Sequence, residues 1–321
     1  MNKFYPFFFI NQLNFTKKKY GRQPAIIQLT PLLMLFFILM GRESRAQSNP
    51  FHAMYFQNRY LANPAMAGMQ QMLNINIGYQ QQWNSFPGSP KTQSLTADGG
   101  LSDKAGVGLN INNDNAGLIQ TTRVLGSYAY HVPLNGDGQK LNFGLSLGIN
   151  SSSLNNGEVN ADMSDNAIRQ YNQLKPNIDG DLGIAYTGKN LFVGITMQNL
   201  RSIFYGTSDT RVNVDADQFM AMTSYKIKIE SYSGMSVEPL MGLRHISGFS
   251  DIVDAGFNFS LDPYGINLLN IYHSNKNMTF GMGFDVQSFN INVSYNTETG
   301  PIKTFTGGAF EFGLKMRLFE R

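Results

Sequence analysis

Hydrophobic and polar residues alternate along most of this chain. In the stretch 309–319, Phe310, Phe312 and Leu314 fall on one face of an extended backbone, and Glu311 and Lys315 fall on the other. A period of two residues is typical of a β-strand with one apolar face. Because the same alternation recurs along the chain with almost no helical periodicity between the repeats, we predict an all-β protein.

The alternation predicts about fourteen strands. The ninth is the weakest, because Pro239 lacks the backbone N–H that a neighbouring strand would accept. The predicted ranges are 73–79, 91–97, 107–111, 124–130, 141–150, 178–187, 191–197, 219–230, 235–246, 253–261, 266–273, 278–286, 289–295 and 309–319.

Three features favour a membrane barrel over a soluble sandwich. The strand faces opposite the apolar ones carry Asn, Ser, Gly and Thr, which suits a wet or side-chain-filled lumen. The last strand could close a barrel by pairing with the first. Long connections alternate with mostly short ones, although 247–250 and 274–276 break this trend; the long ones are 83–90, 112–119, 151–176, 198–217 and 298–306. We therefore predict an antiparallel transmembrane β-barrel of about fourteen strands, formed by residues 73–321.

Residues 1–46 have the composition of an export signal. A basic stretch at 17–22 precedes an apolar run at 26–40, and Ser44-Arg45-Ala46 is a small-x-small cleavage site. We predict a signal peptide, with the mature chain beginning at Gln47 in the outer membrane. The alternative is a retained membrane anchor, for which the apolar run is short.

Removal of this signal changes what the charge implies. The formal net charge of +3 falls to about −3 when residues 1–46 are cleaved. Nucleic-acid binding then loses its compositional support, and we expect no nucleic-acid partner. The chain has no Cys, which rules out a disulfide framework and cysteine-ligated zinc.

Residues that could carry chemistry are scattered. The four histidines lack metal-ligand spacing, and the sequence has no Gly-x-Ser-x-Gly elbow and no complete glycine-rich nucleotide motif; the histidines are His52, His131, His245 and His273. We expect no catalytic, metal or cofactor site. Basic residues near strand ends are expected to reach towards lipid headgroups; they are Lys140, Lys226, Lys228, Lys315 and Arg317.

Residues 47–72 form a segment of a different character. Aromatic residues are dense there, but Pro64 and Gly68 oppose any regular element. Such aromatics need a protein surface to cover them, and the barrel mouth or lumen would supply it. A frayed terminus, the alternative, fits the aromatic content poorly.

Several motifs of the mature chain occur together in a known family. They are Phe51-x-x-x-Tyr55, Tyr60-Leu61-x-Asn63-Pro64-Ala65-x-Ala67-Gly68, Gln82-Trp83-x-x-Phe86-x-Gly88-Ser89-Pro90-Lys91-Thr92, Gly106-x-Gly108 with Asp114-x-x-Gly117, Tyr128-Ala129-Tyr130-His131, and Leu141-x-Phe143-Gly144-x-x-x-Gly148. With them the chain resembles the PorP/SprF proteins of type IX secretion over residues 47–319. The resemblance implies an outer-membrane barrel that helps secrete or anchor cell-surface proteins such as gliding adhesins. It also implies periplasmic partners from the secretion machinery or associated with peptidoglycan.

The candidate partner-binding residues lie in the aromatic segment and in the loop after the first strand. Trp83 is the only tryptophan, and tryptophan is strongly enriched among binding hot spots. A place in an interfacial aromatic girdle would explain Trp83 equally well. The candidates are Phe51, Tyr55, Tyr60, Asn63, Pro64, Trp83, Phe86 and Lys91. Two other functions stay open, a diffusion porin or small-solute transporter and a barrel enzyme.

Overall fold

The computed structural model describes residues 51, 53–82, 88–136, 138–154, 175–205, 217–229, 234–297 and 307–319. The predicted signal peptide lies outside these residues, as do Trp83 and Phe86 of the loop after the first strand. Cleavage after Ala46 therefore stays a prediction.

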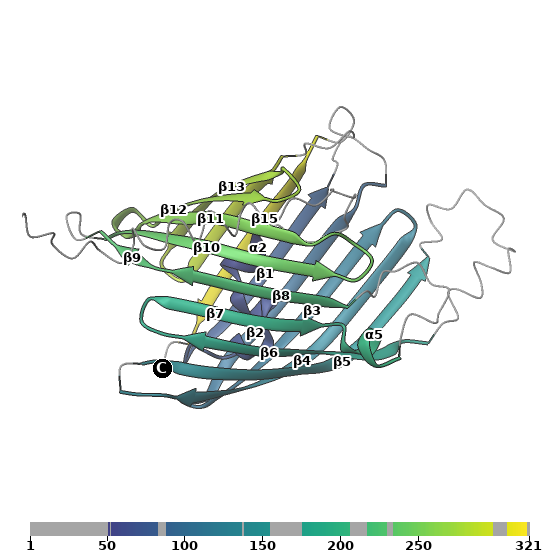
Figure 1. Ribbon diagram of the computed structural model, residues 1–321, viewed down its shortest axis with the longest axis horizontal. Helices are drawn as coiled ribbons and strands as arrows, with labels where there is room; N and C mark the ends of the chain where they lie inside the picture. Colours follow the sequence, from purple (N-terminus) through teal and green to yellow (C-terminus); the bar gives the residue numbers. More distant parts are fainter. Residues whose placement is uncertain are drawn as a thin grey trace, which may run out of the picture. The chain divides into compact units, whose positions relative to one another are not determined.

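The described chain forms a closed antiparallel barrel of fourteen strands with one additional short strand (Figure 1). Each strand pairs with its neighbours in sequence, except that β8 pairs with β10 and the short β9 pairs only with β10; the β10–β11 and β15–β1 pairings complete the ring. The predicted fold is confirmed. The strands are β1 (Leu73–Gln82), β2 (Lys91–Ser102), β3 (Ala105–Ala116), β4 (Ile119–Pro133), β5 (Lys140–Leu154), β6 (Asn177–Thr187), β7 (Leu191–Gln198), β8 (Gln218–Tyr225), β9 (Ile227–Lys228), β10 (Met235–Ile246), β11 (Ile252–Leu261), β12 (Ile266–His273), β13 (Met278–Val286), β14 (Phe289–Asn296) and β15 (Ala309–Leu318).

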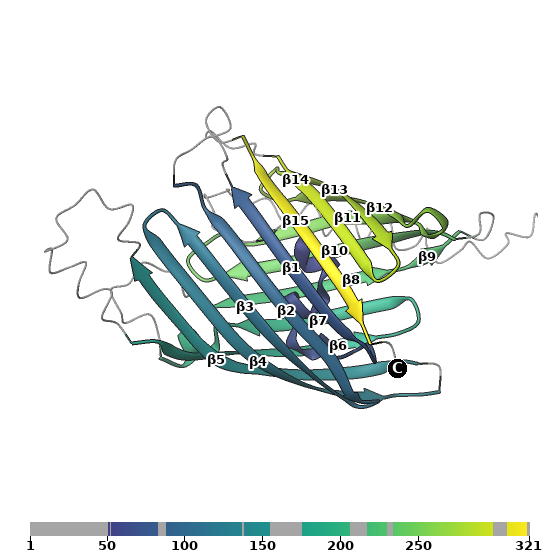
Figure 2. The ribbon, with the colours of Figure 1, turned by 180° about the vertical axis from the view of Figure 1, so that it is seen from behind.

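The last strand closes the barrel against the first (Figure 2). The β1–β15 register runs without a break from Leu73 opposite Leu318 to Gln82 opposite Ala309. The ladder at this seam is therefore continuous and leaves no open sheet edge, as the hydrocarbon core of a membrane requires.

The two faces of the wall differ as the alternation predicts. On β13, Phe280, Met282 and Phe284 are 48%, 45% and 42% exposed on the outside, whereas Thr279 is fully buried on the inside. The outer face of the barrel is apolar over most of its circumference, and the inner face carries amides, hydroxyls, glycines and charges. An apolar exterior of this kind suits contact with lipid.

One connection predicted to be long is a tight turn. The range 112–119 was expected to be a loop, but β3 continues to Ala116 and β4 begins at Ile119, with Gly117 in the left-handed region at φ 60°. Polar side chains of this stretch bond across the strands instead of forming turns. For example, Thr92 Oγ1 donates to Asp114 Oδ1 (2.6 Å). The alternation of long and short connections is correspondingly weaker than predicted.

Pro239 lies inside a strand, but at a break in its pairing. β10 pairs with β8 from Leu240 onward and with β9 up to Val237, so the ladder is interrupted beside the proline. A residue without an N–H is tolerated at such a position. On its other side β10 pairs with β11 without interruption.

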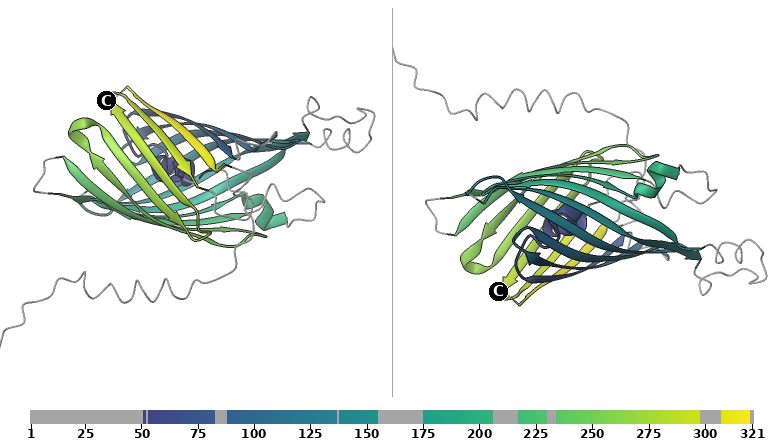
Figure 3. Two further views of the ribbon diagram at one scale, coloured as in Figure 1. Left: turned by 90° about the horizontal axis from the view of Figure 1, so that it is seen from above. Right: turned by 90° about the horizontal axis from the view of Figure 1, so that it is seen from below.

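The segment before β1 lies inside the barrel (Figure 3). It contains two short helices, α2 (Met54–Gln57) and α3 (Arg59–Ala62), and the 3-10 helix η1 (Pro64–Met66). We call Phe51 and residues 53–69 the plug. Outside the lumen, α5 (Leu200–Tyr205) follows β7 and η2 (Asp262–Tyr264) joins β11 to β12. Among the described residues, no helix has the length and apolar character needed to cross a membrane.

We assign the barrel end where β15 finishes as the periplasmic end. The turns at 103–104, 188–190 and 287–288 gather there, and short turns mark the periplasmic side of outer-membrane barrels. The connections at 155–176 and 199–217 leave from the opposite end.

Candidate functional site

The hydrophobic core of this protein is the lumen itself. Phe51, Tyr55, Tyr60 and Leu61 of the plug are each 5% exposed or less, and they pack against inward-facing residues such as Met220. Phe51 and Tyr55 contact each other edge to face, with ring centroids 5.9 Å apart. Their burial replaces the water that would fill an open pore.

The buried tyrosine hydroxyls stay protonated. Burial raises the pKa of Tyr55 to about 12. It also raises the pKa of Tyr60, whose hydroxyl lies 2.8 Å from Ser127 Oγ. Both hydroxyl groups are therefore neutral at physiological pH.

Asn63 fixes the plug to the wall and shapes the plug locally. Its side-chain amide donates to the carbonyl oxygens of Ile184 on β6 (3.2 Å) and Ile195 on β7 (3.1 Å). Its Oδ1 accepts from Ala65 N (2.9 Å), which caps the 3-10 helix, and Pro64 occupies the first position of that helix. Asn63-Pro64-Ala65 is thus a docking element.

Glycines on the inner face make room for this docking element. A Cβ at Gly144 of β5 would collide with the Ala65 backbone, and one at Gly183 of β6 would collide with the Asn63 side chain. On β3, a Cβ at Gly106 would meet the Ala67 carbonyl, and one at Gly108 would meet the Tyr60 ring. Only glycine lets the plug and the strands approach each other this closely. Gly106, Gly108 and Gly144 belong to the sequence motifs, so the motifs describe the two halves of one contact.

The end of the plug nearest β1 is held by polar contacts. Gly68 has φ 66° and donates its N–H to Asp98 Oδ2 (3.0 Å). His131 Nε2 lies 3.1 Å from the Ala67 carbonyl, and its Nδ1 lies 2.9 Å from Asn142 Oδ1. A positive φ favours glycine, which accounts for the residue type at position 68.

The other end of the plug is held by buried charges. Glu311 of β15 accepts from the backbone N–H groups of Ala53 and Met54 (both 3.1 Å) and from Gln80 Nε2 (2.9 Å). Arg244 of β10 donates to the Phe51 carbonyl (3.3 Å). Charge-assisted bonds in a water-poor lumen are stronger than neutral ones.

Arg244 belongs to a buried network that joins β10, β11, β12 and β13. Its guanidinium donates to both carboxylate oxygens of Asp254 (2.7 and 2.8 Å). Asp254 Oδ1 lies 2.6 Å from His273 Nδ1, and His273 Nε2 lies 2.7 Å from Thr279 Oγ1. All four side chains are 2% exposed or less. This network is closed to solvent.

A second charged cluster lies nearer the long connections. Arg123 of β4 forms ion pairs with Asp179 and Asp181 of β6, both at 2.7 Å. The same carboxylates accept from the backbone N–H groups of Arg201 (3.2 Å) and Asn199 (3.1 Å). The cluster therefore fixes the start of the 199–217 connection to the inner wall.

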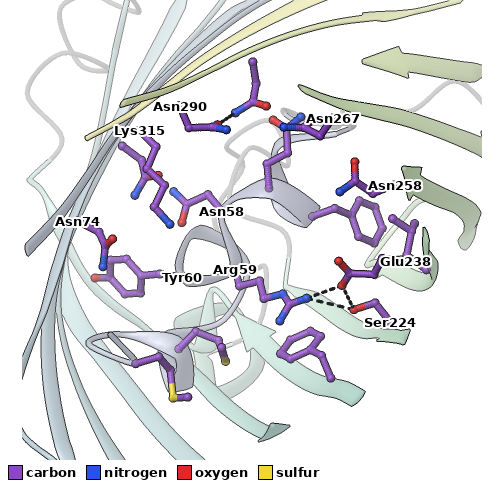
Figure 4. Close-up of a pocket in the computed structure, with 18 of the residues that line it drawn as sticks. Asn58, Arg59, Tyr60, Asn74, Ser224, Glu238, Asn258, Asn267, Asn290 and Lys315 are labelled. Carbon is purple, nitrogen blue, oxygen red and sulfur yellow. Dashed lines mark hydrogen bonds and ion pairs between the residues drawn. The ribbon is translucent and has the colours of Figure 1, made fainter. Parts of the chain in front are cut away.

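Beneath the plug the lumen opens into a cavity of about 610 Å³, which we call the vestibule (Figure 4). It is lined by Phe56–Tyr60 of the plug and by inward residues at the periplasmic ends of the strands, including Asn74, Asn258, Asn267, Asn290 and Lys315. On one side, Arg59 Nη2 donates to Glu238 Oε1 (2.7 Å), and the guanidinium stacks 4.3 Å from the centre of the Phe192 ring.

The predicted partner-binding residues lie in different parts of the molecule. Five of them are enclosed together in the lumen: Phe51, Tyr55, Tyr60, Asn63 and Pro64. Lys91 is exposed at the start of β2 and is not near them in the lumen. Trp83 and Phe86 lie outside the described residues. That these residues contact a partner stays a prediction.

Sequence reasoning missed the residues that hold the plug. Glu311, Asp98, Arg244 and Asp254 are charges on inward-facing strand positions, and that placement is the signal that could have found them. The prediction that Lys226, Lys315 and Arg317 reach towards lipid headgroups is wrong, because all three line the vestibule. Lys315 and Arg317 lie four and six residues after Glu311, so they share its inward face. Within the described ranges, no group of three His, Asp or Glu side chains has the arrangement of a metal site.

Comparisons with solved structures find other outer-membrane barrels at low identity. The Acinetobacter baumannii outer membrane protein Omp33 is 9% identical, with 78% of this chain and 100% of that chain covered and a TM-score of 0.46. A deletion mutant of the monoaromatic hydrocarbon channel TodX is 10% identical, with 80% and 92% covered and a TM-score of 0.47. Similarity at this level says nothing of a shared function.

Comparison with curated protein sequences finds no significant match. Residues 44–316 match the family described as "Type IX secretion system membrane protein PorP/SprF". The match spans most of the chain, from the plug motifs to residue 316 within β15. The chain therefore belongs to the PorP/SprF family of type IX secretion system membrane proteins.

Proposed function

We propose that this outer-membrane component of type IX secretion is a non-catalytic anchoring barrel that helps secrete or hold cell-surface proteins such as gliding adhesins. The observation that supports the proposal is the plug, which occupies part of the lumen with a hydrophobic core and is tied to the wall at both ends by Glu311, Arg244 and Asp98. A barrel with a fixed, buried segment in its lumen is suited to holding a partner rather than to passing solutes.

The porin alternative makes a direct prediction about transport. A diffusion pore needs a continuous aqueous path, whereas here the core of the barrel is a hydrophobic cluster. The purified protein in liposomes should therefore admit small sugars far more slowly than a porin tested in parallel. Sugar uptake at porin-like rates would contradict the anchoring proposal.

The loop around Trp83 offers a test in cells. If the loop contacts a secreted protein, Trp83→Ala should leave the barrel assembled but reduce display of a surface adhesin, because a hot-spot aromatic carries much of the binding energy. Surface immunolabelling would measure display per assembled barrel. Tyr264→Ala is the matched control, since Tyr264 is an aromatic residue, 76% exposed, in a turn at the opposite end.

A different result is expected if Trp83 belongs to the interfacial aromatic girdle and contacts no secreted protein. A girdle residue stabilises the barrel at the membrane interface and needs no partner. Trp83→Ala would then lower the abundance of the barrel and leave display per barrel unchanged. That outcome would remove the loop from the set of partner contacts.

The remaining parts of the proposal concern processing and periplasmic partners. We expect cleavage after Ala46, so N-terminal sequencing of the membrane-extracted protein should begin at Gln47. A mature chain that retained residues 26–40 would contradict this. Affinity purification from detergent-solubilised membranes should recover periplasmic proteins of the secretion machinery or proteins associated with peptidoglycan.

A further inference from the structure

Lys315 projects from β15 into the vestibule without an ion-pair partner. Within the described part of the chain its ammonium group forms no hydrogen bond or salt bridge. The carboxylates whose charge acts on it are Asp98 and Asp285. Asp98 accepts from Gly68 N (3.0 Å), and Asp285 accepts from Arg317 Nη2 (3.0 Å). The Lys315 ammonium is therefore available to pair with an anion that enters the cavity.

The vestibule as a whole has more free positive than free negative charge. Its arginines are engaged, Arg59 with Glu238 and Arg317 with Asp285. Lys226, between β8 and β9, also lines the cavity, and its side chain forms no ion pair among the described residues. Two ammonium groups then face one further carboxylate, Asp98. The surplus favours an anionic ligand.

Asparagines surround Lys315. In the strand register Lys315 lies opposite Asn76 on β1 and Asn290 on β14. All three side chains line the cavity (Figure 4). Asn74, on the same face of β1 as Asn76, has a buried side-chain oxygen without a hydrogen-bond partner in the described structure. Amides both donate and accept, as peptide groups do, so these side chains can bond an extended peptide backbone.

We propose that the vestibule binds a short peptide segment carrying a carboxylate, presented from the periplasmic end, with Lys315 as the contact for the carboxylate. The cavity of about 610 Å³ lies within the roughly 300–1,000 Å³ of sites that enclose a ligand of drug size, which corresponds to a few residues. The proposal deepens the anchoring function, on which it rests for the presence of a periplasmic partner. A protein attached here would be held at the base of the plug.

The chemistry favours a carboxylate over a phosphate. Planar guanidinium groups suit phosphate, and both vestibule arginines are already engaged with carboxylates. The carboxylate can come from the C-terminus of a peptide or from an acidic side chain. Both sources offer the same group to Lys315, and the experiment separates them.

The test uses the mature protein in detergent micelles and three acetylated pentapeptides, with binding measured by titration calorimetry. Gly-Ser-Asp-Ser-Gly amide carries only a side-chain carboxylate. Gly-Ser-Asn-Ser-Gly with a free C-terminus carries only a terminal carboxylate. Gly-Ser-Asn-Ser-Gly amide carries neither. We expect at least one carboxylate peptide to bind at least tenfold more tightly than the neutral peptide.

Variants locate the binding site. Lys315→Met should weaken binding of the carboxylate peptide about tenfold or more, because a charge-assisted hydrogen bond is lost, and Lys315→Arg should retain most of it. Lys104→Met is the matched control, since Lys104 is exposed in the β2–β3 turn at the same end of the barrel, outside the vestibule. Slower migration of the heated than of the unheated sample on a gel would verify that each variant is folded.

Three results would overturn the proposal: no binding of either carboxylate peptide, equal binding of the neutral peptide, or unchanged binding in folded Lys315→Met. None of them bears on surface display, so the anchoring function would stand. Conversely, porin-like sugar uptake would remove the anchoring function even if the peptides bind.

Discussion

The plug meets the barrel wall differently on its two sides. Towards β3, β5 and β6, the element Asn63–Gly68 lies against glycines so closely that backbone touches backbone. Towards β11, β14 and β15, an earlier part of the plug, Phe56–Tyr60, borders a cavity lined by asparagines and lysine. Both surfaces belong to the polar face of one continuous sheet. Residue type at inward positions, and not polarity alone, therefore decides where the lumen is sealed and where it stays open.

Charge also differs between the contacts that hold the plug and the vestibule. The charges that hold the plug are buried and bonded to its backbone, as with Glu311 and Arg244. In the vestibule they are partly exposed, and Lys315 has no ion-pair partner among the described residues. A buried pair stabilises only while both members remain, whereas a half-exposed lysine adds little to stability.

The largest effect is expected at Arg244. Arg244→Met would leave Asp254 buried beside His273 without its guanidinium, and breaking a buried pair in this way costs about 3–5 kcal/mol. The midpoint of urea unfolding, followed by heat-modifiable gel migration, would report the loss. Arg244→Met combined with Asp254→Asn should recover part of it, because no unpaired carboxylate remains. An unchanged midpoint in the single variant would show that the network does not hold the barrel.

A larger residue at Gly144 should disrupt the close contact between β5 and the plug. A Val side chain there collides with the Ala65 backbone, and overpacking of this kind costs about 1–3 kcal/mol. The plug can relieve the clash by leaving the wall, so Gly144→Val should also raise ion conductance in planar bilayers. Gly126→Val is the control, because a Cβ at Gly126 of the adjacent β4 has its nearest contact at 3.9 Å, with Leu147 O. Equal conductance in the two variants would mean that the glycine contact does not seal the lumen.

The architecture could be predicted from sequence because it rests on local alternation. The spacing of Phe310, Phe312 and Leu314 shows within five residues that they share one face of the strand. The same period of two residues correctly predicts that Met282 faces outward and Thr279 inward. The alternation fails at Asn113 and Asp114, whose side chains are typical of turns but here bond across strands to Thr122 and Thr92. Local composition cannot distinguish a polar strand above the membrane from a loop.

The site could be predicted only in outline, because its contacts join distant parts of the chain. The density of aromatic residues in 47–72 predicts that this segment packs against a protein surface. No local sequence pattern shows that the backbone N–H groups of Ala53 and Met54 donate to Glu311, more than 250 positions away. The alternation alone assigns the inward glycines to a polar face. Gly106 and Gly144 are instead places where a second backbone must pass.

The smallest effect is expected at Lys315, on the open side. The side chain borders a wide cavity and has no ion-pair partner in the described residues, so Lys315→Met removes a charge without leaving another group unpaired. Substitutions of this kind usually change the free energy of unfolding by less than about 0.5 kcal/mol. Urea unfolding of Lys315→Met should therefore match the unsubstituted protein, in contrast to Arg244→Met measured alongside. A loss above about 1 kcal/mol would mean that Lys315 supports the barrel as Arg244 does, and the division between a sealed and an open side would fail.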